Sequence, residues 1–123
     1  MSDLRGKRAL VTGASSGIGA AIARILAALG VNLVLAARRR DALEAVAAEC
    51  TALGSTVEVV TADLGTPSGA GDLWRAATAG GAIDLLINNA GFGYFRAFAG
   101  ADWQRDHELL QLNITSLVEL SRR

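Results

Sequence analysis

The fold is decided by the stretch Thr12-Gly13-Ala14-Ser15-Ser16-Gly17-Ile18-Gly19, residues 12–19. It joins two stretches in which the apolar residues recur at different spacings. Residues 8–12 are a short apolar run of the kind found in buried strands, and the apolar residues after the stretch repeat at helical spacing. These are Ile18, Ile22, Ile25, Leu26 and Leu29. The sequence therefore predicts a strand, a glycine-rich turn and a helix in immediate succession.

The three glycines of this turn have different expected tasks. Gly13 allows a tight turn off the strand, Gly17 lets the backbone approach a bound pyrophosphate, and Gly19 lets the helix pack closely. The loop N–H groups and the positive end of the helix dipole would then face the phosphates. The expected contacts run along Gly13, Ser15, Ser16, Gly17, Ile18 and Gly19. The spacing is G-x-x-x-G-x-G and not the general G-x-G-x-x-G, and an ordinary flexible turn is the alternative.

The rest of the chain repeats the alternation of strand and helix. Further strands are predicted at 31–36, 56–62 and 83–88, and further helices at 41–53, at 72–79 and from Asp102 to the end. This order indicates an α/β fold, a Rossmann-type doubly wound parallel sheet with strand order 3-2-1-4. The third strand alternates apolar and polar residues, which suits a sheet edge. We expect one domain over residues 1–123, with the remainder of the sheet missing.

Composition excludes several classes of function. Twelve basic and twelve acidic residues give zero formal net charge, so nothing favours nucleic acid or an anionic membrane. No apolar run approaches the roughly 20 residues of a membrane helix. The polar first eight residues do not resemble a secretion signal, and we expect a cytoplasmic protein. Cys50 is the only cysteine, which excludes an internal disulfide and predicts a packed or half-exposed thiol.

The end of the second predicted strand is basic. Arg38, Arg39 and Arg40 follow it, and no acidic residue occurs before Asp41. In dinucleotide-binding folds an acid here holds the ribose 2′-hydroxyl of NAD, whereas an arginine accommodates the 2′-phosphate of NADP. A solvated basic helix start is the alternative, although basic residues oppose the dipole at a helix N-terminus. Arg38 and Arg39 therefore predict NADP(H) as cofactor.

Three further motifs complete a recognisable set. Asn88-Asn89-Ala90-Gly91 closes the fourth predicted strand, Asp63-Leu64 follows the third, and Asn113 lies in the last predicted helix. Together with the glycine-rich turn they resemble the short-chain dehydrogenase/reductase family. The resemblance covers nearly the whole chain, and the pair TGxxxGxG and NNAG is highly specific.

The resemblance implies roles for the matching residues. Asp63 would bind the adenine amino group with the Leu64 backbone beside it, and Asn88 would tie the central strands together. The residues lining the ribose and nicotinamide would be Asn89, Ala90 and Gly91. Asn113 would be the catalytic asparagine that holds a water molecule in a proton relay. Without the family, Asn113 is simply a polar residue on a helix face.

The sequence departs from the family in its catalytic pair. The family needs a Tyr-x-x-x-Lys motif, but Tyr94 and Lys7 are the only tyrosine and lysine and stand in the wrong order. The matching segment and the catalytic serine would lie beyond Arg123, so residues 1–123 alone are predicted to be inactive. His107 has charged neighbours and is expected to be solvated. Trp74 and Trp103 are expected to pack in helices.

Three functions remain open at this point. The first is an NADP(H)-dependent oxidoreductase that transfers hydride between the nicotinamide and a carbonyl or alcohol substrate. The others are a dinucleotide-binding module without chemistry and a remnant that binds nothing. The loop 92–98 forms either an apolar substrate wall or simple packing. Residues 83–87 lack a gatekeeping lysine or proline, and the last predicted helix has two apolar stripes. We therefore expect either that more protein follows or that a homo-oligomer forms through the fourth-strand edge or the last helix.

Overall fold

The computed structural model describes residues 4–15, 17–63, 68–89 and 110–113. Strands and helices alternate over most of this range, as the sequence predicts. In chain order the elements are β1 (Arg8–Thr12), α1 (Gly17–Ala28), β2 (Asn32–Ala37), α2 (Arg40–Ala52), β3 (Val57–Thr61), α3 (Gly69–Ala79), β4 (Leu85–Asn88) and β5 (Leu110–Asn113). No helix in this part of the chain has the length and apolar character needed to cross a membrane.

The strands form one parallel sheet in the order β3-β2-β1-β4-β5. The predicted order 3-2-1-4 is confirmed within it, with β3 at one edge. β1 lies in the middle, and its last residue, Thr12, is paired with Ala36 of β2 and Asn88 of β4. Because the strands are parallel, all their carboxyl ends lie along the same edge of the sheet.

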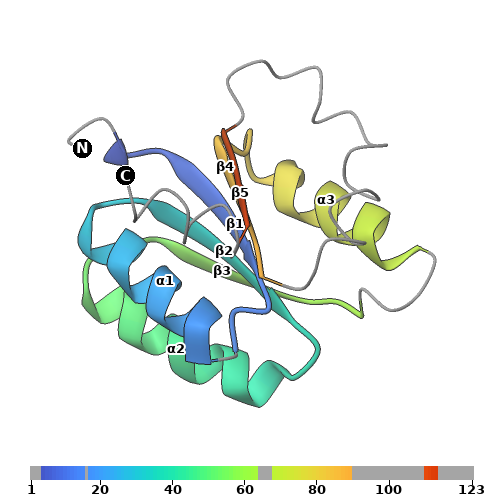
Figure 1. Cartoon of the computed structure of the whole chain (residues 1–123), viewed down its shortest axis with the longest axis horizontal. Coiled ribbons are helices and arrows are strands. Elements are labelled where there is room, and N and C mark those ends of the chain that lie inside the picture. Colours follow the sequence, from blue (N-terminus) through green and yellow to red (C-terminus); the bar gives the residue numbers. More distant parts are fainter. Residues whose placement is uncertain (1–3, 16, 64–67, 90–109, 114–123) are drawn as a thin grey trace.

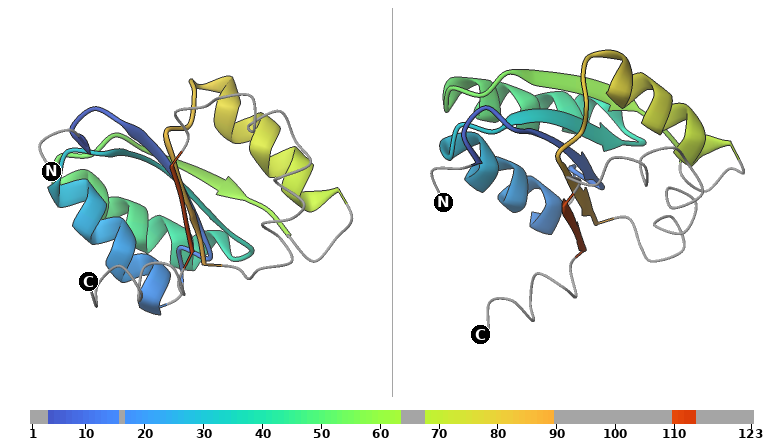
Figure 2. Two further views of the ribbon diagram at one scale, coloured as in Figure 1. Left: turned by 45° about the horizontal axis from the view of Figure 1, so that its top comes forward. Right: turned by 90° about the horizontal axis from the view of Figure 1, so that it is seen from above.

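Helices cover both faces of the sheet. α1 and α2 lie side by side on one face, and α3 lies on the other (Figures 1 and 2). The apolar side chains of the central strands are divided between two buried clusters. The larger one packs beneath α1 and α2, and the smaller one joins Leu10, Val34 and Leu86 to α3. This is the doubly wound arrangement that the sequence predicts.

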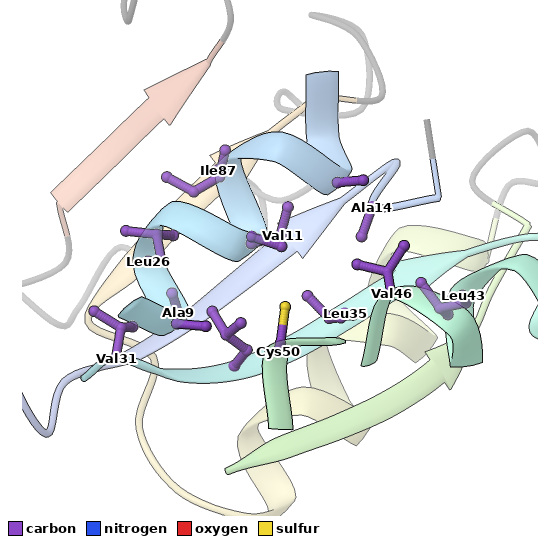
Figure 3. Close-up of a cluster of buried hydrophobic side chains, with 14 of the residues drawn as sticks. Ala9, Val11, Ala14, Leu26, Val31, Leu35, Leu43, Val46, Cys50 and Ile87 are labelled. Carbon is purple, nitrogen blue, oxygen red and sulfur yellow. The ribbon is translucent and has the colours of Figure 1, made fainter. Parts of the chain in front are cut away.

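Two residues singled out in the sequence belong to these cores. Cys50 is fully buried in the larger cluster, close to Leu35 and Val46 (Figure 3). Burial raises the pKa of its thiol above the ordinary value of 9.0 because the charged thiolate would be desolvated. Trp74 packs in the smaller cluster. Both side chains therefore pack as expected.

The C-terminal segment corrects one prediction. Residues from Asp102 onward were expected to be helical, but Leu110–Asn113 forms β5 and pairs in parallel with β4. The sequence Leu-Gln-Leu-Asn also alternates with the period of a strand, and a fifth strand satisfies backbone groups that β4 would otherwise leave unpaired. The fourth strand is therefore not an exposed edge, and the self-association expected through that edge has lost its basis. Residues 102–109 and 114–123 lie outside the described residues.

A polar anchor holds the opposite edge of the sheet, where the strands begin. The Arg8 guanidinium donates a hydrogen bond of 2.7 Å to the carbonyl oxygen of Ala77 at the end of α3 and lies 3.1 Å from the Glu58 carboxylate of β3. The Arg8 amide also donates to the Asp84 carboxylate at 2.9 Å. These contacts join β1, β3 and α3 at the edge where the strands begin.

Candidate functional site at the carboxyl edge of the sheet

The predicted site residues that the structure describes lie along the carboxyl edge. The glycine-rich loop follows β1, Arg38 follows β2, Asp63 lies two residues beyond β3, and Asn89 follows β4. The strand register brings these positions into the spatial order Asp63, Arg38, loop, Asn89. In open α/β sheets, ligands bind outside the carboxyl ends of the strands where the strand order reverses, which here lies between β1 and β4.

The glycine-rich loop begins with the predicted tight turn. Gly13 has a φ of +62°, a left-handed conformation that favours glycine. The next residue ties the loop to the neighbouring strand, because the Ala14 amide donates a 3.1 Å hydrogen bond to the carbonyl oxygen of Ala36. This hydrogen bond ties the start of the loop to the end of β2.

Asn89 holds the same loop from the other side. Its side-chain amide donates to the carbonyl oxygen of Gly13 at 3.0 Å, and its backbone amide donates to the Thr12 hydroxyl at 3.1 Å. The Thr12 hydroxyl is buried and donates a long hydrogen bond of 3.5 Å to the Ile87 carbonyl. Sequence reasoning missed Thr12. Its signal was a hydroxyl residue at the end of an otherwise apolar buried strand.

Gly19 and Gly17 differ sharply in their surroundings. A Cβ on Gly19 would overlap the carbonyl oxygen of Gly13 and lie 2.7 Å from the Asn89 side-chain nitrogen. The close packing predicted at Gly19 is therefore packing against the loop and Asn89. Among the described residues, and apart from its chain neighbours and the backbone of α1 itself, a Cβ on Gly17 would meet no atom within 4 Å. Gly17 is exposed and borders open space at the first residue of α1.

This open space suits an anionic group. The first N–H groups of a helix have no partners within the helix and carry the positive end of its dipole. The first turn of α1 holds no acidic side chain that would repel an anion. A backbone without a side chain at Gly17 admits a phosphate to contact distance. The described residues therefore fit the pyrophosphate of a dinucleotide.

The three arginines after β2 are not equivalent. Arg40 lies 3.1 Å from the Glu44 carboxylate one turn along α2, and Arg39 lies 3.9 Å from Asp41 with both side chains largely exposed. Arg38 is exposed and, within the described part of the chain, forms no ion pair. It is therefore the arginine of the three whose charge is not already engaged by a carboxylate.

Asp63 marks the other end of the edge. It is exposed, and it lines a cavity of about 370 Å³ between the end of β3 and α3. The other lining residues are Val60, Thr61, Ala62, Gly69, Asp72, Leu73 and Ala76. The neighbouring Asp72 carboxylate is engaged with Arg75. Asp63 thus lies beside a cavity lined partly by apolar side chains, at the end of the site farthest from Asn89.

Several predicted residues cannot be placed in this geometry. Ser16, Leu64, Ala90, Gly91, Tyr94, Trp103, His107 and the loop 92–98 lie outside the described residues. Asn113 ends β5, where its backbone pairs with that of Asn88, so it stands on a strand and not on the predicted helix. Its backbone position is at the carboxyl edge with the other site residues.

Residues 7–123 match the family model described as short chain dehydrogenase. The chain belongs to this family. The resemblance inferred from the glycine-rich loop and the Asn-Asn-Ala-Gly motif is therefore confirmed.

Similar proteins support the same assignment. Nodulation protein G of Rhizobium sp. (strain N33) is 40% identical over 99% of this chain and 49% of its own length. The Pseudomonas aeruginosa RhlG/NADP active-site complex has a TM-score of 0.67 and 39% identity over 72% of this chain and 35% of its own. The NADH-dependent reductase A1-R' complexed with NAD has a TM-score of 0.68 and 34% identity, over 74% and 38%. The chain spans about half the length of the curated relatives it matches.

Proposed function

We propose that this chain is the cofactor-binding half of an NADP(H)-dependent oxidoreductase that acts on a carbonyl or alcohol substrate. Family membership supports the oxidoreductase class, and solved relatives that hold NADP or NAD support a nicotinamide dinucleotide. When bound, the nicotinamide supplies or accepts the hydride. The binding module without chemistry has no observation in its favour beyond the missing Tyr-x-x-x-Lys pair.

The chain's own groups would hold the dinucleotide along the carboxyl edge. The loop from Gly13 to Gly19 and the N-terminus of α1 would bind the pyrophosphate through N–H groups and the helix dipole. Asn89 keeps that loop in shape through its bond to the Gly13 carbonyl. By family resemblance, the adenine would contact Asp63 and Leu64, and the ribose and nicotinamide would contact Asn89, Ala90 and Gly91. Asn113 would hold a water molecule for proton transfer.

The choice of NADP(H) depends on one observation, the free charge of Arg38 beside the phosphate loop. An arginine presents several N–H donors in a planar fork that matches a phosphate. Arg39, the next residue, would be a second contact, although Asp41 shares its charge. The 2′-phosphate is the feature that distinguishes NADP(H) from NAD(H), so a contact with Arg38 would act on NADP(H) alone.

Calorimetric titration with NADPH and NADH tests this assignment. A charge-assisted contact contributes roughly 1.5–3 kcal/mol, so Arg38→Ala should weaken NADPH binding about tenfold or more and leave NADH binding unchanged. Arg40→Ala is the matched control, because Arg40 already pairs with Glu44. An equal loss for both cofactors, or an equal loss in the control variant, would refute the role of Arg38.

The remaining expectations are proposals as well. We propose a small-molecule carbonyl or alcohol substrate, a homo-oligomeric assembly and a cytoplasmic location. The substrate proposal follows from the family. The assembly proposal no longer includes the β4 edge, because β5 occupies it.

A further inference from the structure

The cavity between α3 and the end of β3 is large for a contact between a helix and a sheet. Its volume is about 370 Å³, whereas folded proteins contain few voids larger than a water molecule. The helix residues that line it are Gly69, Asp72, Leu73 and Ala76. Because they stand at the spacing i, i+3, i+4 and i+7, they belong to one face of α3, the face turned towards the sheet.

Small side chains account for this space. Gly69 has no side chain, and Ala76 and Ala62 each have a single methyl group. Val60 and Ala62 pack in the smaller core cluster with Leu73, on the α3 side of the sheet, and both are only partly buried. The inner wall of the cavity is therefore apolar. A ring or an alkyl group placed there would be removed from water, which is favourable.

The polar side of the cavity is acidic. Asp63 and Asp72 line it, and none of the described lining residues is basic. Asp72 is a charged residue on the sheet-facing side of α3, where an amphipathic helix normally carries apolar residues. Carboxylates accept hydrogen bonds and attract positive charge. The lining therefore favours a ligand with an ammonium group over an anion.

Arg75 does not reverse this preference. Its guanidinium contacts Oδ1 of Asp72, and both side chains are largely exposed, so the pair contributes little by itself. A carboxylate has two oxygens and about four lone pairs, so Oδ2 can accept a further hydrogen bond. Arg75 offsets one of the two carboxylate charges, and the N-terminal end of α3 adds roughly half a positive charge. The second carboxylate still leaves the cavity negative.

We propose that this cavity is a binding site for a small ammonium compound with an apolar body. The apolar body rests on Leu73 and Ala76, and the ammonium group donates a hydrogen bond to Asp72. The volume is near the lower limit of small-molecule pockets, roughly 300 Å³, and suits a molecule with a single ring. The site is separate from the proposed function, because the dinucleotide would run from Asp63 to Asn89 along the carboxyl edge, whereas this ligand contacts α3.

The test uses benzylamine, which is protonated at neutral pH, and benzyl alcohol, its uncharged counterpart of nearly the same shape. Each is titrated into the isotope-labelled 123-residue chain without cofactor, and binding is followed by nuclear magnetic resonance. We expect benzylamine to shift signals of α3 and the end of β3. Benzyl alcohol should bind on the order of tenfold more weakly or worse, because it lacks the charge-assisted contact.

Two variants divide the site into its polar and apolar parts. Asp72→Asn should weaken benzylamine about tenfold and leave benzyl alcohol unchanged. Glu44→Gln is its matched control, because Glu44 also pairs with an arginine of its own helix but lies on α2, outside the cavity. Ala76→Leu fills the cavity and should abolish binding of both probes at wild-type helix content. Ala79→Leu, at the exposed last residue of α3, should bind both probes normally.

Four results would overturn the proposal. They are no shift of α3 signals with benzylamine, equal affinity for the two probes, an equal loss in Asp72→Asn and Glu44→Gln, and displacement of benzylamine by NADPH. The last result would assign the cavity to the cofactor, whereas unchanged benzylamine binding in the presence of NADPH is the expected outcome. If Ala76→Leu loses helix content, the comparison of Asp72→Asn with Glu44→Gln decides.

Discussion

The glycines of the phosphate loop provide the sharpest test of the site, because alanine at two of them should have opposite consequences. A Cβ on Gly19 would overlap a backbone carbonyl of the loop and lie 2.7 Å from the Asn89 side chain. A backbone atom cannot swing aside as a flexible side chain can. Overpacking of this kind costs about 1–3 kcal/mol, and we expect Gly19→Ala to be near the upper end, which lowers the thermal midpoint by roughly 10 °C.

Gly17→Ala should leave the fold intact. In the described part of the chain, no atom beyond the adjacent residues and the α1 backbone lies within 4 Å of the added Cβ, and Gly17 is exposed. Exposed substitutions away from special features change stability by about 0.5 kcal/mol or less. The same methyl group would, however, occupy the space through which a phosphate approaches the start of α1. We therefore expect NADPH binding to weaken by about tenfold or more.

Differential scanning fluorimetry with and without NADPH, followed by calorimetric titration, measures both effects on the same proteins. Circular dichroism establishes that Gly17→Ala has the wild-type helix content. The reasoning fails if Gly19→Ala melts with the wild-type protein, or if Gly17→Ala is destabilised as much as Gly19→Ala. It also fails if Gly17→Ala binds NADPH with wild-type affinity, because the open space would then not be the phosphate site.

Three further predictions concern Thr12, Cys50 and catalysis. Thr12→Val removes the hydroxyl that accepts a hydrogen bond from the Asn89 backbone amide. It should lower the free energy of unfolding by about 1–3 kcal/mol in chemical denaturation. An unchanged denaturation midpoint would contradict the role of this hydrogen bond. The pKa of the Cys50 thiol is raised in the folded state. The stability that the protonated thiol contributes is therefore complete below pH 9 and is lost as the pH rises through the higher folded pKa. Cys50→Ala should flatten the alkaline fall in unfolding free energy, and a pH profile identical to that of the wild type would refute this expectation. Residues 1–123 contain no Tyr-x-x-x-Lys pair, so mass-verified protein should show no NADPH oxidation with a panel of ketones, and steady turnover would disprove the expectation.

The sequence was most informative where one residue pattern admits one structure. Residues 8–12 and 31–36 are nearly continuous apolar runs, and only strands buried on both faces fit such runs next to glycine and helical patterns. The turn at Gly13 followed from the motif for the same reason, since its φ of +62° favours glycine. The edge position of β3 followed from the alternation of Val57, Glu58 and Val59, which are half-buried, exposed and half-buried.

The sequence was least informative where the apolar residues fit both helical and strand spacing. Leu110 and Leu112 alternate as on one face of a strand, but each also stands at helical spacing from leucine or isoleucine residues farther along the chain. The pairing with β4 that decides between the two depends on a contact outside the segment. The same limit applied at the site. The hydrogen bond between Thr12 and Asn89 joins residues 77 positions apart in the sequence, so no local sequence pattern predicts it. Likewise, the ion pairs that leave Arg38 as the available arginine are visible only in three dimensions.

The central position of β1 has a consequence for the order in which the molecule is assembled. β1 pairs with β2 across a short stretch of chain, but its contacts with β4 join residues 76 apart. Such distant contacts form late, because the entropy of closing a long loop opposes them. As the chain leaves the ribosome, β1, β2 and β3 can pair before Asn89 exists. The glycines of the nucleotide loop are thus synthesised near the start, while the group that locks their conformation is added some 70 residues later.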